Sequence, residues 1–85
     1  MYLARVFISL KPTVNDPQGQ TILGSVHQLG FATVRSVRAG KYMEVRLDEE
    51  DEGAAAEQIK AICEKLLANP VIEVYRFELE QVSTT

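Results

Sequence analysis

The predicted fold depends on the stretch TVRSVRAGKYMEVRL at residues 33–47. Residues 33–38 and 42–47 are rich in β-forming side chains, and Ala39-Gly40-Lys41 between them has the length and composition of a hairpin loop with glycine at the tight position. In the second run Met43, Val45 and Leu47 alternate with Tyr42, Glu44 and Arg46, which is typical of a strand with one buried face. The stretch therefore predicts two adjacent antiparallel strands.

The sequence before this stretch predicts a strand and a helix. Residues 3–10 alternate like a strand, and Asp16-Pro17 pairs a helix-capping acceptor with a residue preset for the first helical position. Apolar residues then recur at helical spacing until Gly30, where a C-terminal residue with positive φ is expected. We therefore expect a strand at residues 3–10 and a helix at residues 17–29.

The sequence after it predicts a second helix and a last strand. The acidic run at residues 48–52 is favoured at the positive end of a helix dipole. An apolar stripe at helical spacing follows, made of Ala55, Ala56, Ile59, Ile62, Cys63, Leu66 and Leu67. Asn69-Pro70 ends this helix, residues 71–80 alternate as a strand, and residues 81–85 are expected to form a frayed tail.

The resulting order, βαββαβ, predicts one α+β domain over residues 1–85: a two-layer ferredoxin-like fold, with a four-stranded antiparallel sheet and both helices on one face. The first and third strands are central in that topology. Their other face would lack a covering layer and would mix two aromatic side chains with charges of both signs. We expect this face to form an oligomer interface through Phe7, Tyr42, Glu44 and Arg46.

Composition narrows the possible functions. The chain has 85 residues, of which 46% are hydrophobic, and it has a single cysteine, so it predicts one small core with no internal disulfide to stabilise it. Oligomerisation is then the expected source of additional stability. A net charge of −3 argues against nucleic-acid binding, and the lack of a long apolar run argues against a membrane span. The default location is the cytoplasm.

The residues form no recognisable catalytic or metal-binding set. His27 is expected at the surface or core edge, Cys63 in the core, and the acidic run lacks the ligand spacing of a calcium loop. Phe7 and Tyr42 could stack RNA bases, but Glu44 beside them would repel phosphate. Gly19 lowers the stability of the first helical turn, which can indicate close approach of another backbone or of a ligand.

Four motifs in order then give a specific resemblance: DPQG at residues 16–19, LGF at 29–31, VxxVRxGKxxE at 34–44 and LANPVIE at 67–73. Together they resemble the PurS family, the small subunit of phosphoribosylformylglycinamidine synthase. The resemblance implies a homodimer or homotetramer without catalytic residues of its own. It would bridge a glutaminase subunit, PurQ, which releases ammonia, and an ATP-dependent synthetase subunit, PurL, which converts formylglycinamide ribonucleotide into formylglycinamidine ribonucleotide.

In this interpretation ATP and magnesium are used by the complex, and no cofactor is bound by this chain. Its contribution would be to hold the two enzymes together so that ammonia passes between them. The expected partner-binding residues are polar or conformationally special positions at loops and helix ends: Asp16, Gln18, Gly19, Arg38, Gly40 and Lys41. The alternative is a free-standing ferredoxin-like module that senses a small molecule. Co-purification with the two enzymes would favour the subunit, and stabilisation by a ligand alone would favour the sensor.

Overall fold

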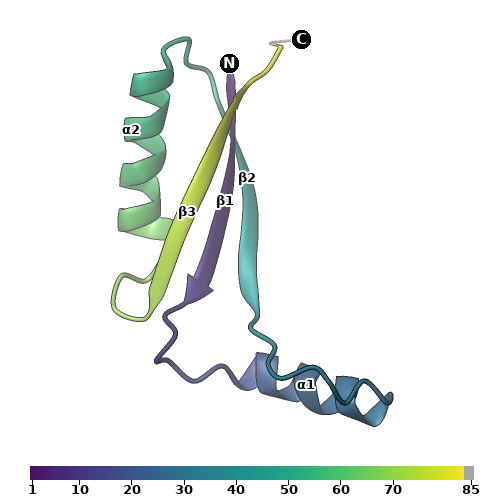
Figure 1. Cartoon of the computed structure of the whole chain (residues 1–85). Helices are drawn as coiled ribbons and strands as arrows, with labels where there is room; N and C mark the ends of the chain where they lie inside the picture. The colour runs from purple at the N-terminus through teal and green to yellow at the C-terminus, as the bar shows by residue number, and fades with distance from the viewer. Residues whose placement is uncertain (84–85) are drawn as a thin grey trace.

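The structure is a computed structural model that describes residues 1–83. It contains three strands, two α-helices and a short π-helix. In chain order these are β1 (Tyr2–Leu10), α1 (Pro17–Gln28), β2 (Gly40–Leu47), α2 (Glu52–Ile62), η1 (Cys63–Leu67) and β3 (Glu73–Gln81). The strands form one antiparallel sheet in the order β2-β1-β3, with α2 beside it and α1 beyond one end of it (Figure 1).

The predicted four-stranded sheet is wrong, because residues 33–38 form no strand. This segment lies along α1 instead. The Val34 amide donates to the Phe31 carbonyl at 3.4 Å, and the Val34 carbonyl lies 2.7 Å from His27 Nε2. Its β propensity is not realised because its contacts with the arm hold it beyond the end of the sheet, away from the free edges of β2 and β3 (Figure 1). As a consequence β1 is central, as expected, but β2 is an edge strand rather than a central one.

The prediction that both helices cover the sheet is also wrong. Only α2 packs on the sheet, and the chain core consists of alternate β1 side chains such as Val6 and Ile8 against Ala55, Ile59 and Cys63. Cys63 is fully buried, as predicted. Helix α1 contributes only Gly19 to the buried residues.

One residue of the apolar stripe predicted for the second helix, Leu66, is not on its buried side. Leu66 is 78% exposed, whereas Leu67 is half-buried against the core. The cause is the π-helix η1, in which the Ala68 amide donates to the Cys63 carbonyl at 2.9 Å. A π turn holds more residues than an α turn, so the side chains that follow Cys63 are rotated around the helix axis.

Residues 17–38, which we call the arm, extend the molecule well beyond its core (Figure 1). Helix α1 begins at Pro17 after Asp16, as predicted, and Gly30 has a φ of +98°. The radius of gyration is 16.6 Å, against about 12 Å for a compact domain of this length. The arm therefore leaves the chain less compact than a self-sufficient domain.

The C-terminal strand is displaced from its predicted bounds. It begins at Glu73 rather than at residue 71 and includes Gln81, and the Val82 amide donates to the Met1 carbonyl at 2.9 Å. Residues 81 and 82 are therefore ordered by β1 rather than frayed, and the last two residues of the expected tail lie outside the described part. Within residues 1–83 no helix is long and apolar enough to cross a membrane.

Candidate functional site

The arm meets the sheet at a joint built around Asp16. Its carboxylate accepts hydrogen bonds from the Gly19 amide at 3.0 Å and from the Ala39 amide at 2.7 Å. The first bond caps α1, and the second ties the chain before α1 to the chain that enters β2. Asp16 is only 4% exposed, and these two backbone donors hold its pKa below the usual range of a carboxyl group.

Three neighbouring residues close the joint. Arg38 Nη2 donates to the carbonyls of Lys11 and Val14, each at 3.0 Å, so it binds the segment that leaves β1. A Cβ atom at Gly19 would lie closer than 3.0 Å to the Val37 carbonyl oxygen, which confirms that glycine is needed for the approach of another backbone. Gly40 similarly admits the Ile8 carbonyl.

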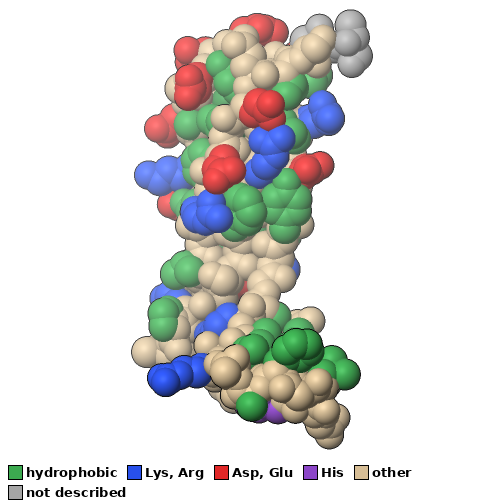
Figure 2. All heavy atoms as spheres, turned by 45° about the vertical axis from the view of Figure 1, so that its right-hand side comes forward, with side chains coloured by type: hydrophobic (Ala, Val, Ile, Leu, Met, Phe, Trp, Pro, Cys, Tyr) green, Lys and Arg blue, Asp and Glu red, His purple; other side chains and the backbone are tan. Residues whose placement is uncertain are grey.

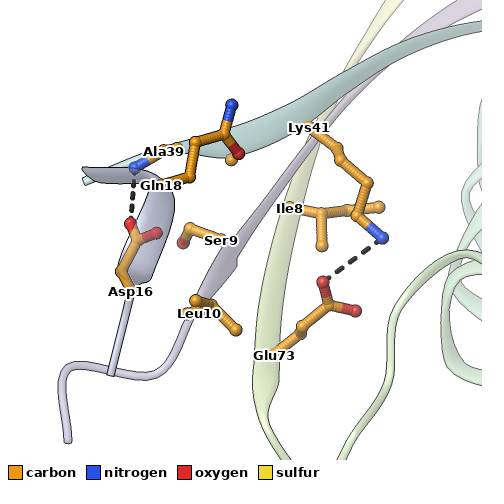
Figure 3. A pocket seen from close by; sticks show the side chains of 9 residues that line it. Ile8, Ser9, Leu10, Asp16, Gln18, Ala39, Lys41 and Glu73 are labelled. Atoms are coloured by element: carbon orange, nitrogen blue, oxygen red, sulfur yellow. Dashed lines mark hydrogen bonds and ion pairs between the residues drawn. The ribbon is translucent and has the colours of Figure 1, made fainter. Parts of the chain in front are cut away.

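A partly open pocket of about 250 Å³ lies beside this joint, at the end of the sheet (Figure 3). Asp16 and Ala39 border one side, the end of β1 lies between, and Lys41 and Glu73 face each other on the other side. Lys41 Nζ lies 3.3 Å from a Glu73 carboxylate oxygen. The Asn69 amide donates to the other oxygen of Glu73 at 2.7 Å. This bond is the main cause that lowers the pKa of Glu73, and the charge of Lys41 is a smaller one.

The predicted partner-binding residues are brought together here. Asp16, Gln18, Gly40 and Lys41 line the pocket, and Gly19 and Arg38 belong to the adjoining joint. The structure also gives Asp16, Gly19, Arg38 and Gly40 roles inside the chain, so only Gln18 and Lys41 present exposed side chains without such a role in the joint. The sequence interpretation missed Glu73, although it closes the quoted motif LANPVIE.

The predicted oligomer-interface residues lie together on the sheet face opposite α2, which we call the open face. Phe7 and Tyr42 are cross-strand partners with ring centroids 5.1 Å apart, and the Tyr42 hydroxyl donates to Glu44 at 2.8 Å. That bond to a carboxylate raises the pKa of Tyr42. Arg46 follows on the same face, opposite Leu3. The four residues therefore form a continuous part of one surface.

Strand β3 completes the open face with residues that were not singled out from the sequence. Arg76 is the β3 partner of Phe7, and its guanidinium carbon lies 3.9 Å from the centre of the Phe7 ring. Arg5 bonds Glu80 at 2.6 Å, and Arg76 bonds Glu78 at 3.1 Å. The face therefore presents two aromatic rings among charges of both signs. The alternation within β3 was the signal that could have placed Arg76 here.

Two of the apolar surfaces that the described residues leave uncovered lie on the arm and on β2. On the arm, Ile22, Phe31 and Leu29 are 40%, 61% and 75% exposed, and Figure 2 shows hydrophobic side chains gathered on this lower part of the molecule. On the sheet, α2 packs against β1 and β3, while Met43 and Val45 of β2 stay only partly buried although they point to the side of α2. Among the described residues, the apolar side of α1 thus packs on no sheet, and Met43 and Val45 of β2 are covered by no helix.

Outside these surfaces, the described residues include an acidic run at residues 48–52 but no metal-binding group. No three His, Cys, Asp or Glu side chains within residues 1–83 are placed to hold a metal ion together. Burial raises the pKa of the Cys63 thiol, which keeps it protonated in the core. His27 is exposed on the arm, as expected.

Comparison with known proteins assigns the chain to a family. The family described as "PurS: Phosphoribosylformylglycinamidine (FGAM) synthase" matches residues 3–81. Phosphoribosylformylglycinamidine synthase subunit PurS of Bacillus subtilis is 45% identical over 82 residues, which cover 96% of each chain.

Solved structures of this family share the fold. PurS of Methanocaldococcus jannaschii, described as a subunit of formylglycinamide ribonucleotide amidotransferase in the purine biosynthetic pathway, matches with a TM-score of 0.87 and 40% identity over 98% of this chain and 100% of its own. A chain of the PurLQS structure from Thermotoga maritima matches with a TM-score of 0.83 and 28% identity, over 94% of this chain and 99% of its own. The chain therefore belongs to the PurS family, the family of a subunit of phosphoribosylformylglycinamidine synthase.

Proposed function

We propose that this chain is a non-catalytic bridging subunit that couples a glutaminase subunit to an ATP-dependent synthetase subunit in the cytoplasm. The observation that carries the proposal is the likeness, over nearly the whole chain, to a chain of the PurLQS structure. Ammonia released from glutamine would pass to the synthetase, which forms formylglycinamidine ribonucleotide. ATP and magnesium would bind the synthetase, and this chain would contribute proximity.

The homo-oligomer needed for this role is proposed to form by exchange of the arm. The apolar side of α1 and its C-terminal loop would pack over the β2 half of the sheet in a second copy, where Met43 and Val45 lack cover. A twofold exchange uses the same two surfaces on each copy and closes on itself. It buries the apolar surfaces of the arm and of β2 at once. Each arm then packs against a sheet instead of extending away from the core.

The open face would then serve a second contact, between two such dimers. Its charges of both signs are mutually complementary when a face meets a copy of itself, and Phe7 and Tyr42 provide an apolar centre. The joint and the pocket lie at the end of the sheet, away from the middle of this face. Gln18 and Lys41 there would meet one of the two enzymes.

Reconstitution tests the bridging role. This chain, a PurL synthetase and a PurQ glutaminase are mixed, and glutamine-dependent turnover is measured with each component omitted in turn. Co-elution of the three proteins and loss of turnover without this chain are expected. If the two enzymes co-elute and turn over glutamine equally well without it, or if a small molecule alone stabilises it while neither enzyme binds, the bridging role is wrong.

Lys41→Ala tests the pocket rim. Lys41 is about half exposed, whereas the Glu73 side chain that it pairs with is only 12% exposed. The Asn69 amide still bonds Glu73 when Lys41 is removed, so thermal stability should fall only modestly, by about 1 kcal/mol. We expect complex formation and glutamine-dependent turnover to fall several-fold. Lys60 is an exposed lysine of α2 that does not line the pocket, so Lys60→Ala is the matched control. Unchanged co-elution and turnover in Lys41→Ala would remove Lys41 from the partner surface.

A further inference from the structure

One charged residue is buried among the described residues, and it lies at the base of the arm rather than in a reactive site. Asp16 is 4% exposed, and both of its carboxylate oxygens are engaged, one by Gly19 N and one by Ala39 N. The two donors belong to segments 20 residues apart in sequence, one entering α1 and one entering β2. A residue that only capped α1 would need the first bond alone.

A comparison within the molecule makes this difference clear. Asp51 occupies the same capping position before α2, and its carboxylate accepts from the Ala54 amide at 2.8 Å. It is exposed and bonds no second segment. The capping role is therefore shared by the two aspartates, and the bond to a distant backbone amide belongs to Asp16 alone.

We propose that Asp16 is a positioning residue that fixes the direction in which the arm leaves the sheet. Its carboxylate ties the chain on both sides of the arm together, and Arg38 reinforces the tie by binding the Lys11 and Val14 carbonyls from the other segment. These three bonds supplement the two covalent connections that join the arm to the sheet. The joint thus presents α1 in one orientation before any partner binds.

This function rests on the proposed exchange of arms, because a preset direction lowers the conformational entropy that is lost when the arm packs on a second copy. Four backbone groups take part: two amides that face the carboxylate and two carbonyls that face the guanidinium. Without the two side chains, the Gly19 and Ala39 amides and the Val14 carbonyl would lose these bonds, whereas the Lys11 carbonyl would keep its bond from the Val14 amide at 2.9 Å. A buried amide left without an acceptor is costly.

Asp16→Asn separates the tie from the cap. Asparagine caps helices about as well as aspartate, but its amide nitrogen cannot accept the Ala39 N–H. We expect hydrogen exchange at residues 17–37 to speed up by about tenfold or more while the sheet amides keep their protection, and the dimer dissociation constant to rise by a similar factor. Asp51→Asn, the matched control, should change neither quantity.

Arg38→Ala provides a second, independent variant in case Asp16→Asn folds poorly. It should speed exchange in the same residues without touching the cap. Wild-type exchange and association in both variants would overturn the proposal, as would an equal effect of Asp51→Asn. Hydrogen exchange measured at concentrations where the protein is a single chain distinguishes the role of Asp16 from the proposed dimer. Faster hydrogen exchange of the arm amides in Asp16→Asn under these conditions supports the role of Asp16 even if the arms do not exchange between copies.

Discussion

Replacing Leu29 and Phe31 together with aspartate is expected to leave the sheet folded but to abolish the arm-exchanged dimer, so that the largest assembly left is a pair of 9.5 kDa chains that meet through their open faces. Both side chains are more than half exposed in the single chain, so their loss removes little packing within it. In an arm-exchanged dimer each side chain would be buried in both copies, so four side chains would be buried in all. Full burial of a large apolar side chain contributes roughly 1.5–3 kcal/mol. Because only the exposed parts of these side chains, 75% and 61%, remain to be buried, the dimer should lose about 4–8 kcal/mol of association free energy.

Sedimentation velocity measures this outcome, and circular dichroism at the same concentration shows whether the chain stays folded. Leu66→Asp is the matched control, because Leu66 is 78% exposed and apolar but lies on η1, outside the arm. It should leave the dimer intact. A double variant that sediments as the wild type does would show that the arm does not bury these side chains in a second copy.

Gly19→Ala should destabilise the protein, whereas Gly24→Ala in the same helix should stabilise it. A Cβ at Gly19 would approach the Val37 carbonyl and would lie 2.8 Å from an Asp16 carboxylate oxygen, whereas nothing lies within 4 Å of a Cβ at Gly24. Overpacking of this kind costs roughly 1–3 kcal/mol. Alanine in a free helical position gains about 1 kcal/mol over glycine.

Chemical denaturation of the two variants measures the opposite signs directly. Gly19→Ala should also weaken association, because the clash lies in the joint that orients the arm. If Gly19→Ala proved as stable as Gly24→Ala, the close contact between α1 and residue 37 would be contradicted, and with it the described direction of the arm.

Local patterns predicted most of the elements correctly. The alternation of residues 3–10 placed Val6 and Ile8 in the core, and Asp16-Pro17 placed the start of α1 at the residue where it begins. These succeed because a strand face and a helix cap depend on neighbouring residues only. The weak helix position of Gly19 also indicated a close backbone contact, which the structure confirms.

The errors concern long-range packing. Residues 33–38 have strand-like composition, but a strand must also lie beside a free edge of the sheet, and composition carries no information on whether the segment reaches one. The apolar spacing of α1 shows that the helix buries a face, without showing whether the cover belongs to the same chain. Leu66 was misplaced because a π turn changes the helical period locally, and no residue type marks such a turn.

The sequence indicated which residues gather at the joint better than it indicated how these residues contact one another. The six residues predicted to bind partners have no visible core role in the sequence, and the structure gathers them at one joint. Several are there to hold the joint itself. A carboxylate that accepts from two distant backbone amides, as Asp16 does, cannot be distinguished in sequence from one that only caps a helix.

The central claim, that this chain couples two enzymes for ammonia transfer, is tested most directly by comparing two nitrogen sources. Synthetase turnover is measured with glutamine and glutaminase present, and again with ammonium salt supplied in place of glutamine, each with and without this chain. Bridging predicts that omission abolishes the glutamine-dependent rate and leaves the ammonium-dependent rate largely intact. Equal loss of both rates, or loss of neither, would contradict it.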